Sequence, residues 1–124
     1  MKVLLSIKPK FVESIIKGNK KYEYRKVIFK KDVDTVVIYK TTPFCKVIGE
    51  FEIDDILCDT PEKIWQRTQE FAGITQDYFN KYFDNRKIAY AIKIGKIKQY
   101  ELEPKDMIKQ FKAPQSFMYW EHNI

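Results

Sequence analysis

The segment from Ser6 to Lys26, SIKPKFVESIIKGNKKYEYRK, gathers six lysines and one arginine, the side chains best suited to holding an anion. Glu23 and Arg25 lie in an alternating K-Y-E-Y-R stretch. A strand with period two places them on one face and the tyrosines on the other. Lys8 and Pro9 stand where a helix would start, and the first N–H groups of a helix attract anions. The pattern therefore predicts a phosphate-binding site in which one carboxylate orients donors or accepts a base N–H group.

The charge of the chain is concentrated in the same region. The net charge is +6, yet residues 1–31 hold ten Lys or Arg and only two acids, while the remainder holds thirteen bases and fifteen acids. Such a local positive field favours an anionic partner, which we expect to be RNA, another single-stranded nucleic acid or a nucleotide-like ligand. The alternative is a basic surface that serves solubility and has no partner.

The length and composition of the chain indicate how many domains it has and which kinds of protein it can be. With 124 residues and 44% hydrophobic content, the chain predicts a single domain over residues 1–124. It has no apolar run of the length that a membrane span needs, so no membrane association is expected. Cys45 and Cys58 form no CxxC pair and are expected to be reduced, half-buried thiols of a cytoplasmic protein. We expect a monomer that holds no cofactor and no metal.

Hydrophobic periodicity divides the chain into strands and helices. We expect strands over Val3–Ile7, Lys21–Arg25, Asp34–Lys40, Lys46–Leu57, Ile88–Tyr100 and Gln115–Trp120. We expect helices from Pro9 to Gly18, from Pro61 after the cap Thr60 to Gly73, over Thr75–Tyr82 and, as a short piece, over Glu103–Phe111. Glycines at 49 and 95 mark bulges or bends in the two longest strands. The order predicts an α+β fold, a small mixed β-barrel with flanking helices.

Several quoted stretches resemble the activating signal cointegrator homology (ASCH) domains. Their opening signature runs Ser-Ile-Lys-Pro, a helix and Gly-x-Lys-x-x-Glu-x-Arg, which SIKPKFVESIIKGNKKYEYRK follows. The stretches TVVIYKTTPFCKVIGEFEIDDI, AYAIKIGKI and APQSFMYW are similar to later strands of the family. The resemblance implies the PUA-like fold, a pseudo-barrel related to RNA-binding domains.

The family resemblance also implies where a ligand binds. ASCH domains are thought to hold RNA or a nucleotide-like ligand in a cleft between the barrel and the first helix. The positions that match the family pattern are Lys8, Lys20, Glu23, Arg25, Gln115 and Ser116. With Lys21 as a further wall of the cleft, these residues form the expected ligand-binding set.

An enzyme on the same cleft is the alternative hypothesis, with Lys20 and Glu23 as the candidate catalytic residues. Some ASCH relatives are amidohydrolases that deacetylate N4-acetylcytidine with a lysine and, three residues on, a threonine nucleophile. Lys20, or Lys21 in a shifted register, takes the lysine position, but Glu23 stands where the threonine would be, and a carboxylate does not replace a hydroxyl in that acyl transfer. A ribonuclease with Glu23 as general base and a Lys or Arg stabilising the phosphorane stays open.

Overall fold

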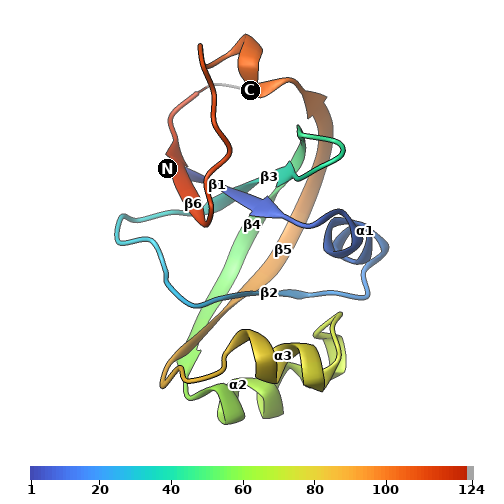
Figure 1. Ribbon diagram of the computed structural model, residues 1–124, viewed down its shortest axis with the longest axis vertical. Coiled ribbons are helices and arrows are strands. Elements are labelled where there is room, and N and C mark those ends of the chain that lie inside the picture. The colour runs from blue at the N-terminus through green and yellow to red at the C-terminus, as the bar shows by residue number, and fades with distance from the viewer. Residues whose placement is uncertain (123–124) are drawn as a thin grey trace.

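The structure, a computed structural model that describes residues 1–122, is built on a six-stranded mixed sheet curled into a half-barrel (Figure 1). The strands are β1 (Lys2–Ile7), β2 (Tyr22–Arg25), β3 (Thr35–Lys40), β4 (Lys46–Asp59), β5 (Ala89–Leu102) and β6 (Phe117–Trp120). Their spatial order is β2-β5-β4-β3-β1-β6, with β1 parallel to β3 and every other neighbouring pair antiparallel. The predicted α+β fold with a mixed, curved sheet is therefore confirmed, and β2 and β6 form its two edges.

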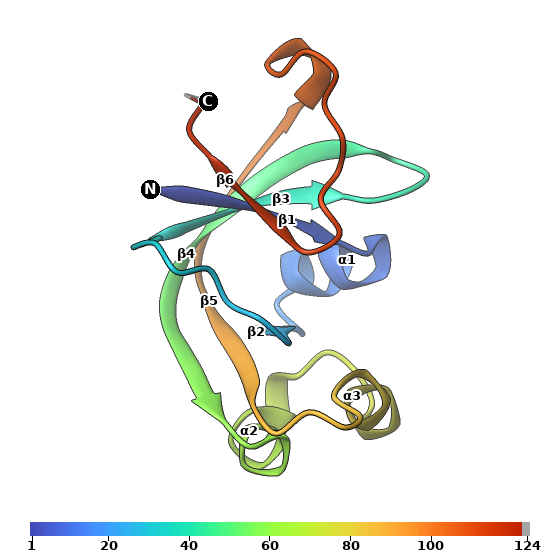
Figure 2. The same ribbon diagram turned by 60° about the vertical axis from the view of Figure 1, so that its left-hand side comes forward.

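Helices lie in two of the connections between strands, β1–β2 and β4–β5. Helix α1 (Pro9–Lys17) follows β1, while α2 (Pro61–Thr68), the 3-10 turn η1 (Gln69–Phe71) and α3 (Gln76–Tyr82) connect β4 to β5. Figure 2 shows α1 inside the curl of the sheet and α2 with α3 at the far end of the β4–β5 pair. No helix within residues 1–122 combines the length and the apolarity that crossing a membrane requires.

The predicted start signals of α2 and α3 and the predicted stop signal of α1 act as expected. Thr60 and Thr75 accept hydrogen bonds from the backbone N–H groups of Lys63 and Tyr78, which caps α2 and α3. Gly18 ends α1 at φ 85°, a left-handed conformation that glycine adopts without a Cβ penalty.

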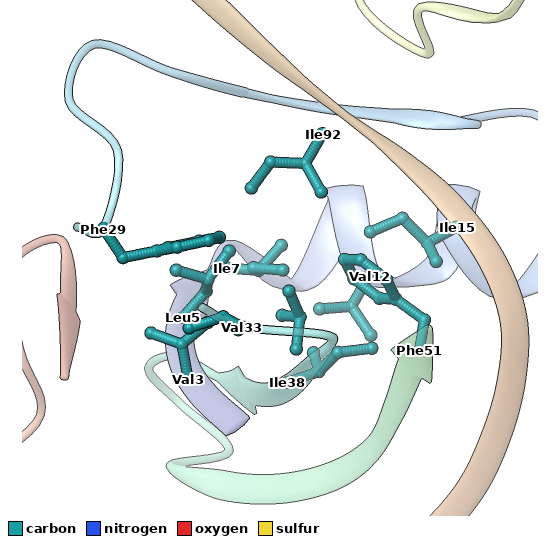
Figure 3. Packing of buried hydrophobic residues seen from close by; sticks show 11 residues of the cluster. Val3, Leu5, Ile7, Val12, Ile15, Phe29, Val33, Ile38, Phe51 and Ile92 are labelled. Atoms are coloured by element: carbon teal, nitrogen blue, oxygen red, sulfur yellow. The ribbon is translucent and has the colours of Figure 1, made fainter. Parts of the chain in front are cut away.

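The main core lies between the curled sheet and α1 (Figure 3). Alternate residues of β1 point to opposite sides, because Val3 and Leu5 join this core while Leu4 packs with Trp120 in a second cluster. Burial on both faces explains why β1 is a continuous apolar run. A third cluster joins α2 and α3 to β2 and β5 around Phe79.

Two expectations are wrong near the ends of helices. The segment Glu103–Phe111 forms only the 3-10 turn η2 (Pro104–Asp106), followed by turns in which Gln110 adopts φ 60°. Its apolar side chains pack on the Trp120 cluster from an irregular backbone, so tertiary packing replaced the helix. Helix α2 ends at Thr68 rather than at Gly73.

Cys45 and Cys58 are free, as expected, but they are exposed rather than half-buried. Cys45 lies in the turn after Phe44, and Cys58 lies near the end of β4, beyond the part of that strand which the core covers.

Candidate functional site

The edge strand β2 positions the central charged residues. It pairs antiparallel with β5, with Glu23 opposite Ile92 and Arg25 opposite Tyr90. Tyr24 turns to the helices, where its hydroxyl lies 2.7 Å from Thr68 Oγ1. Alternation then places Glu23 and Arg25 together on the opposite face, as predicted.

Glu23 and Arg25 form an ion pair that is buried. Arg25 donates from Nε and from Nη2 to Glu23 Oε2, at 3.1 and 2.8 Å, and the side chains are only 10% and 8% exposed, respectively. This pair is therefore not one of the weak surface ion pairs that water and salt screen. Removing one partner of such a buried pair costs about 3–5 kcal/mol, because the other charge remains without compensation.

Arg25 also connects the two edges of the sheet, because it lies on β2 and hydrogen-bonds to residues next to β1 and β6. Its Nη2 donates to the carbonyl of Ser6 at the end of β1 (2.9 Å), and its Nη1 donates to the carbonyl of Ser116 just before β6 (3.2 Å). With the bonds to Glu23, four hydrogen bonds occupy a guanidinium that has five N–H donors. Arg25 therefore holds the half-barrel together across its open side, and it retains one donor for a ligand.

Lys20 is the second buried cation of this region, at 2% exposure. Its Nζ donates to the Ala72 carbonyl at 2.9 Å and lies 4.8 Å from the centroid of the Tyr24 ring. Burial lowers the pKa of Lys20, and the charge of Glu23 offsets this in part. Gly73 makes the burial possible, because a Cβ there would collide with the Lys20 side chain.

Lys20, Glu23 and Arg25, which we call the β2 cluster, thus combine a buried ion pair with a second buried cation just before the same strand. Within residues 1–122, Glu23 Oε1 has no hydrogen-bond partner, and it is not among the fully enclosed unpaired atoms. The cluster has a net charge of +1, one open acceptor on Glu23 and one unused donor on Arg25. It is suited to a ligand with a negative charge and a donor group.

Lys8 and Gln115 share a hollow beside the β2 cluster. This Lys8 hollow has a volume of about 460 Å³ and is lined by Ser6, Lys8, Tyr39, Thr41, Thr42, Cys45, Ala113, Pro114 and Gln115. Ser6 connects it to the β2 cluster, because its carbonyl accepts from Arg25 while its hydroxyl donates to Pro114.

The start of α1 offers fewer free N–H groups than expected. Pro9 has none, and the N–H groups of Phe11 and Val12 both donate to the Lys8 carbonyl. Any anion here therefore depends on the Lys8 side chain more than on the helix end.

The remaining predicted residues are not all brought together. Lys21 precedes β2, is exposed, and lies with its Nζ 4.1 Å above the Phe71 ring. It lines a separate hollow of about 410 Å³ with Lys20, Asp54 and Lys93, away from Lys8. Ser116 contributes its carbonyl to Arg25, with no side-chain hydrogen bond within the described part of the chain.

Two tyrosines of α3 lie at this site, although the predicted ligand-binding set does not include them. Tyr78 accepts a hydrogen bond from Lys8 Nζ at 3.2 Å, and the Tyr82 ring lies 4.7 Å from Lys26 Nζ. Burial raises the pKa of Tyr82, while the charge of Arg25 acts against it and that of Glu23 adds to it, so the phenol is close to the β2 cluster. The signal was available: two tyrosines four residues apart beside two phenylalanines with the same spacing predict a helix face with polar edges.

Few side chains around this site could serve as metal ligands, nucleophiles or general acids and bases. Within residues 1–122 no cluster of His, Cys, Asp and Glu has the arrangement of a metal site. Thr41 and Thr42 supply hydroxyls to the Lys8 hollow, on the side of it that the β3–β4 turn provides. Glu23 and Lys20, the candidate catalytic residues, are both buried.

Comparison with known proteins gives a consistent assignment. A family model described as ASCH domain matches residues 5–98. The crystal structure of the ASCH protein from Zymomonas mobilis superposes with a TM-score of 0.89 at 23% identity, covering 97% of this chain and 87% of that one. A tyrosine-to-phenylalanine variant of it matches with the same TM-score, at 22% identity, covering 97% and 90%. At this identity the likeness concerns the fold.

Two curated relatives come from Ureaplasma parvum serovar 3. ATP synthase subunit alpha is 28% identical over 120 residues, which are 94% of this chain and 15% of that protein. Large ribosomal subunit protein uL22 is 28% identical over 86 residues, which are 68% of this chain and 27% of that protein. The chain thus spans less than a third of either relative.

Proposed function

Because this chain belongs to the ASCH domain family, we propose that residues 1–124 act as a single domain that binds single-stranded RNA or a nucleotide-like part of it. The ligand would lie across the β2 cluster and the Lys8 hollow. The proposed contacts are Lys8, Lys20, Lys21, Glu23, Arg25, Gln115 and Ser116, with Tyr78 and Tyr82 as added walls. We also propose a cytoplasmic monomer, because exposed free thiols such as Cys45 persist in reducing compartments.

The observation that carries the proposal is the unbalanced charge of the β2 cluster. The cluster holds two buried cations and one carboxylate, and a buried excess charge is costly unless a counter-charge is brought near. A phosphate supplies that charge, and the exocyclic amino group of a base supplies a donor for Glu23 Oε1. A single-stranded nucleic acid carries both groups on every suitable nucleotide.

The side chains that line the site are of the kinds that bind single-stranded RNA. Single-stranded RNA is recognised by stacking of splayed bases on aromatic side chains and by contacts to the phosphate backbone. Tyr78 and Tyr82 offer partly exposed rings, and Lys8 and Lys26 lie against them.

The curated relatives add a weaker argument. A segment like this chain occurs in a ribosomal protein and in an ATP synthase subunit, two proteins with unrelated tasks. A segment found in both contexts behaves as a module with its own ligand, and one of these contexts is the ribosome.

Fluorescence-anisotropy titration of a labelled mixed-sequence RNA of about ten nucleotides tests the proposal. The informative variant is Lys8→Glu, because Lys8 is exposed and reversing its charge leaves the core intact. We expect about a tenfold loss of affinity and a salt slope reduced by roughly 0.7 for the lost phosphate contact. Lys63→Glu, the same charge change on exposed α2, is the matched control and should retain near-wild-type affinity.

Arg25→Glu is a poor test, although Arg25 belongs to the predicted ligand-binding set. Arg25 joins β2 to Ser6 and Ser116, so its reversal would disturb the fold together with the ligand. Binding that does not respond to salt, or equal losses in Lys8→Glu and Lys63→Glu, would contradict the proposal.

A hydrolase on the same site is the second candidate, favoured by the lowered pKa of Lys20. Electrophoresis of the RNA after each titration detects cleavage, and mass spectrometry of N4-acetylcytidine incubated with the protein detects deacetylation. Intact substrates support a binding module. Turnover that disappears in Glu23→Gln, in a preparation shown by urea unfolding to be folded, would establish the enzyme.

A further inference from the structure

The turn between β3 and β4 carries an aromatic ring that the core does not use. Phe44 is 47% exposed. The turn is ordered by a hydrogen bond from the Phe44 N–H to the Thr41 carbonyl at 3.1 Å. An exposed phenylalanine held in a defined place adds nothing to the core, which points to a role at the surface.

Lysines surround this ring. Lys40 Nζ lies 3.8 Å from the centroid of Phe44, and Lys46 lies across the turn in an ion pair of 2.9 Å with Glu101. These residues, with Ile48, Gln99 and Tyr100, line a groove of about 470 Å³, which we call the hairpin groove. Lys46 has three donors and uses one on Glu101, so it keeps donors for a second anion.

The turn separates the hairpin groove from the Lys8 hollow. Thr41, Thr42 and Cys45 line the Lys8 hollow, whereas Lys40, Phe44 and Lys46 line the groove. The Thr41 N–H donates to the carbonyl of Ile7, the residue directly before Lys8, at 3.2 Å. The turn therefore stands beside the start of α1, as Figures 1 and 2 both show.

We propose that Phe44 is a second RNA subsite, on which a base stacks as the strand leaves the Lys8 hollow, with Lys40 and Lys46 on the flanking phosphates. The inference rests on the proposed function and extends it from a nucleotide-sized site to a path for several nucleotides. Lys40 lies over one face of the ring, and the exposure of Phe44 leaves ring surface on which a base can stack. Base–aromatic stacking of this kind is tolerant of sequence, since every base has a π-face.

The side chains of the β3–β4 turn favour RNA over a protein partner. A protein partner that docks by burying apolar area would need a contiguous patch of several hundred Å². The β3–β4 turn instead offers one aromatic ring with lysines beside it. This arrangement can stack a base on the ring and pair the lysines with the phosphates on either side of that base. Glu101 is the opposing charge in the groove, and its pairing with Lys46 partly neutralises it.

The test is a length series of one labelled RNA sequence, from two to about ten nucleotides, titrated against the wild type, Phe44→Ala, Phe44→Leu and Phe44→Tyr. In the wild type we expect affinity to rise with length beyond the shortest RNA that binds. Phe44→Ala and Phe44→Leu should bind the shortest RNA like the wild type but lose at least about fivefold on the longest. Phe44→Tyr should behave as the wild type, because it keeps the ring. Ile88→Ala, which trims another exposed apolar residue, is the control and should change nothing.

The outcomes separate this inference from the proposed function. If the wild type binds no RNA of any length, both are overturned. If the shortest RNA binds and Phe44→Ala follows the wild-type length dependence, the subsite is overturned and the proposed function stands. A loss in Phe44→Ala that Phe44→Leu restores would replace stacking by simple apolar contact and would also overturn the subsite.

Discussion

Two ion pairs of nearly equal length show how burial decides what charged residues do in this domain. Arg25 and Glu23 approach to 2.8 Å with side chains 10% and 8% exposed, while Lys46 and Glu101 approach to 2.9 Å with side chains 47% and 66% exposed. In the β2 cluster a buried donor without a partner is costly, so Arg25 uses four of its five donors on Glu23 and on two carbonyl groups of the protein. At the hairpin groove water and salt compete for the charges, so Lys46 can exchange Glu101 for a ligand.

The largest effect is expected from removing the carboxylate of each pair. Glu23→Gln leaves Arg25 and Lys20 without their counter-charge and should lower the free energy of unfolding by about 3–5 kcal/mol, measured by urea denaturation. Glu101→Gln, the matched change in the exposed pair, should leave the unfolding midpoint unchanged within error. Equal effects of the two variants would break the comparison, because burial would then not distinguish the pairs.

A smaller effect should follow from Arg25→Lys, which keeps the charge but loses the fork of donors. A lysine cannot hold Glu23, Ser6 and Ser116 at once with the guanidinium geometry, so we expect a loss of about 1–3 kcal/mol in unfolding free energy. Hydrogen exchange should quicken over residues 113–120, where Arg25 anchors the final segment, and should stay unchanged in the α2–α3 region. Unchanged exchange over residues 113–120 would show that Arg25 does not hold this segment.

The last effect is a pH dependence that is confined to alkaline pH and leaves stability at neutral pH unchanged. Burial raises the pKa of Tyr24 in β2 and of Tyr39 beside the Lys8 hollow to about 12. Unfolded tyrosine ionises near 10, so the unfolded chain loses its protons first and stability falls as pH rises from 10.5 towards 12. Below pH 10.5 Lys20 acts in the opposite direction, because its pKa is lowered.

Each tyrosine should cost about 2–3 kcal/mol by pH 12, if its pKa rises by about two units. Urea unfolding at a series of pH values measures this slope. Tyr24→Phe should be less stable at neutral pH, since it loses the hydrogen bond to Thr68. It should also show a smaller slope than the wild type, the remainder coming from Tyr39, Tyr82 and Tyr100, whose pKa values are raised as well. A full wild-type slope in Tyr24→Phe would exclude Tyr24 as a source.

Local rules of the sequence predict the elements well, because caps and periodicity act within a few residues. Thr60 and Thr75 start α2 and α3, Gly18 ends α1, and alternation in β2 places Glu23 and Arg25 on one face. The predicted ligand-binding role of these residues remains a proposal.

Features that depend on distant segments could not be predicted in the same way. The burial of Arg25 requires Ser116, which is 91 residues away in the chain. The contact of Tyr78 with Lys8 spans 70 residues. The expected helix over Glu103–Phe111 failed for the same reason, since packing on Trp120 outweighed a weak local preference.

The most direct test of RNA binding at this site is an NMR titration that follows each backbone amide while single-stranded RNA of about ten nucleotides is added. We predict that the shifts concentrate on the start of α1, on β2, on α3 near Tyr78 and Tyr82, and on residues 113–116, and that they fade as salt is raised. Shifts confined to α2 and the outer ends of β4 and β5, or none at low salt, would contradict the account.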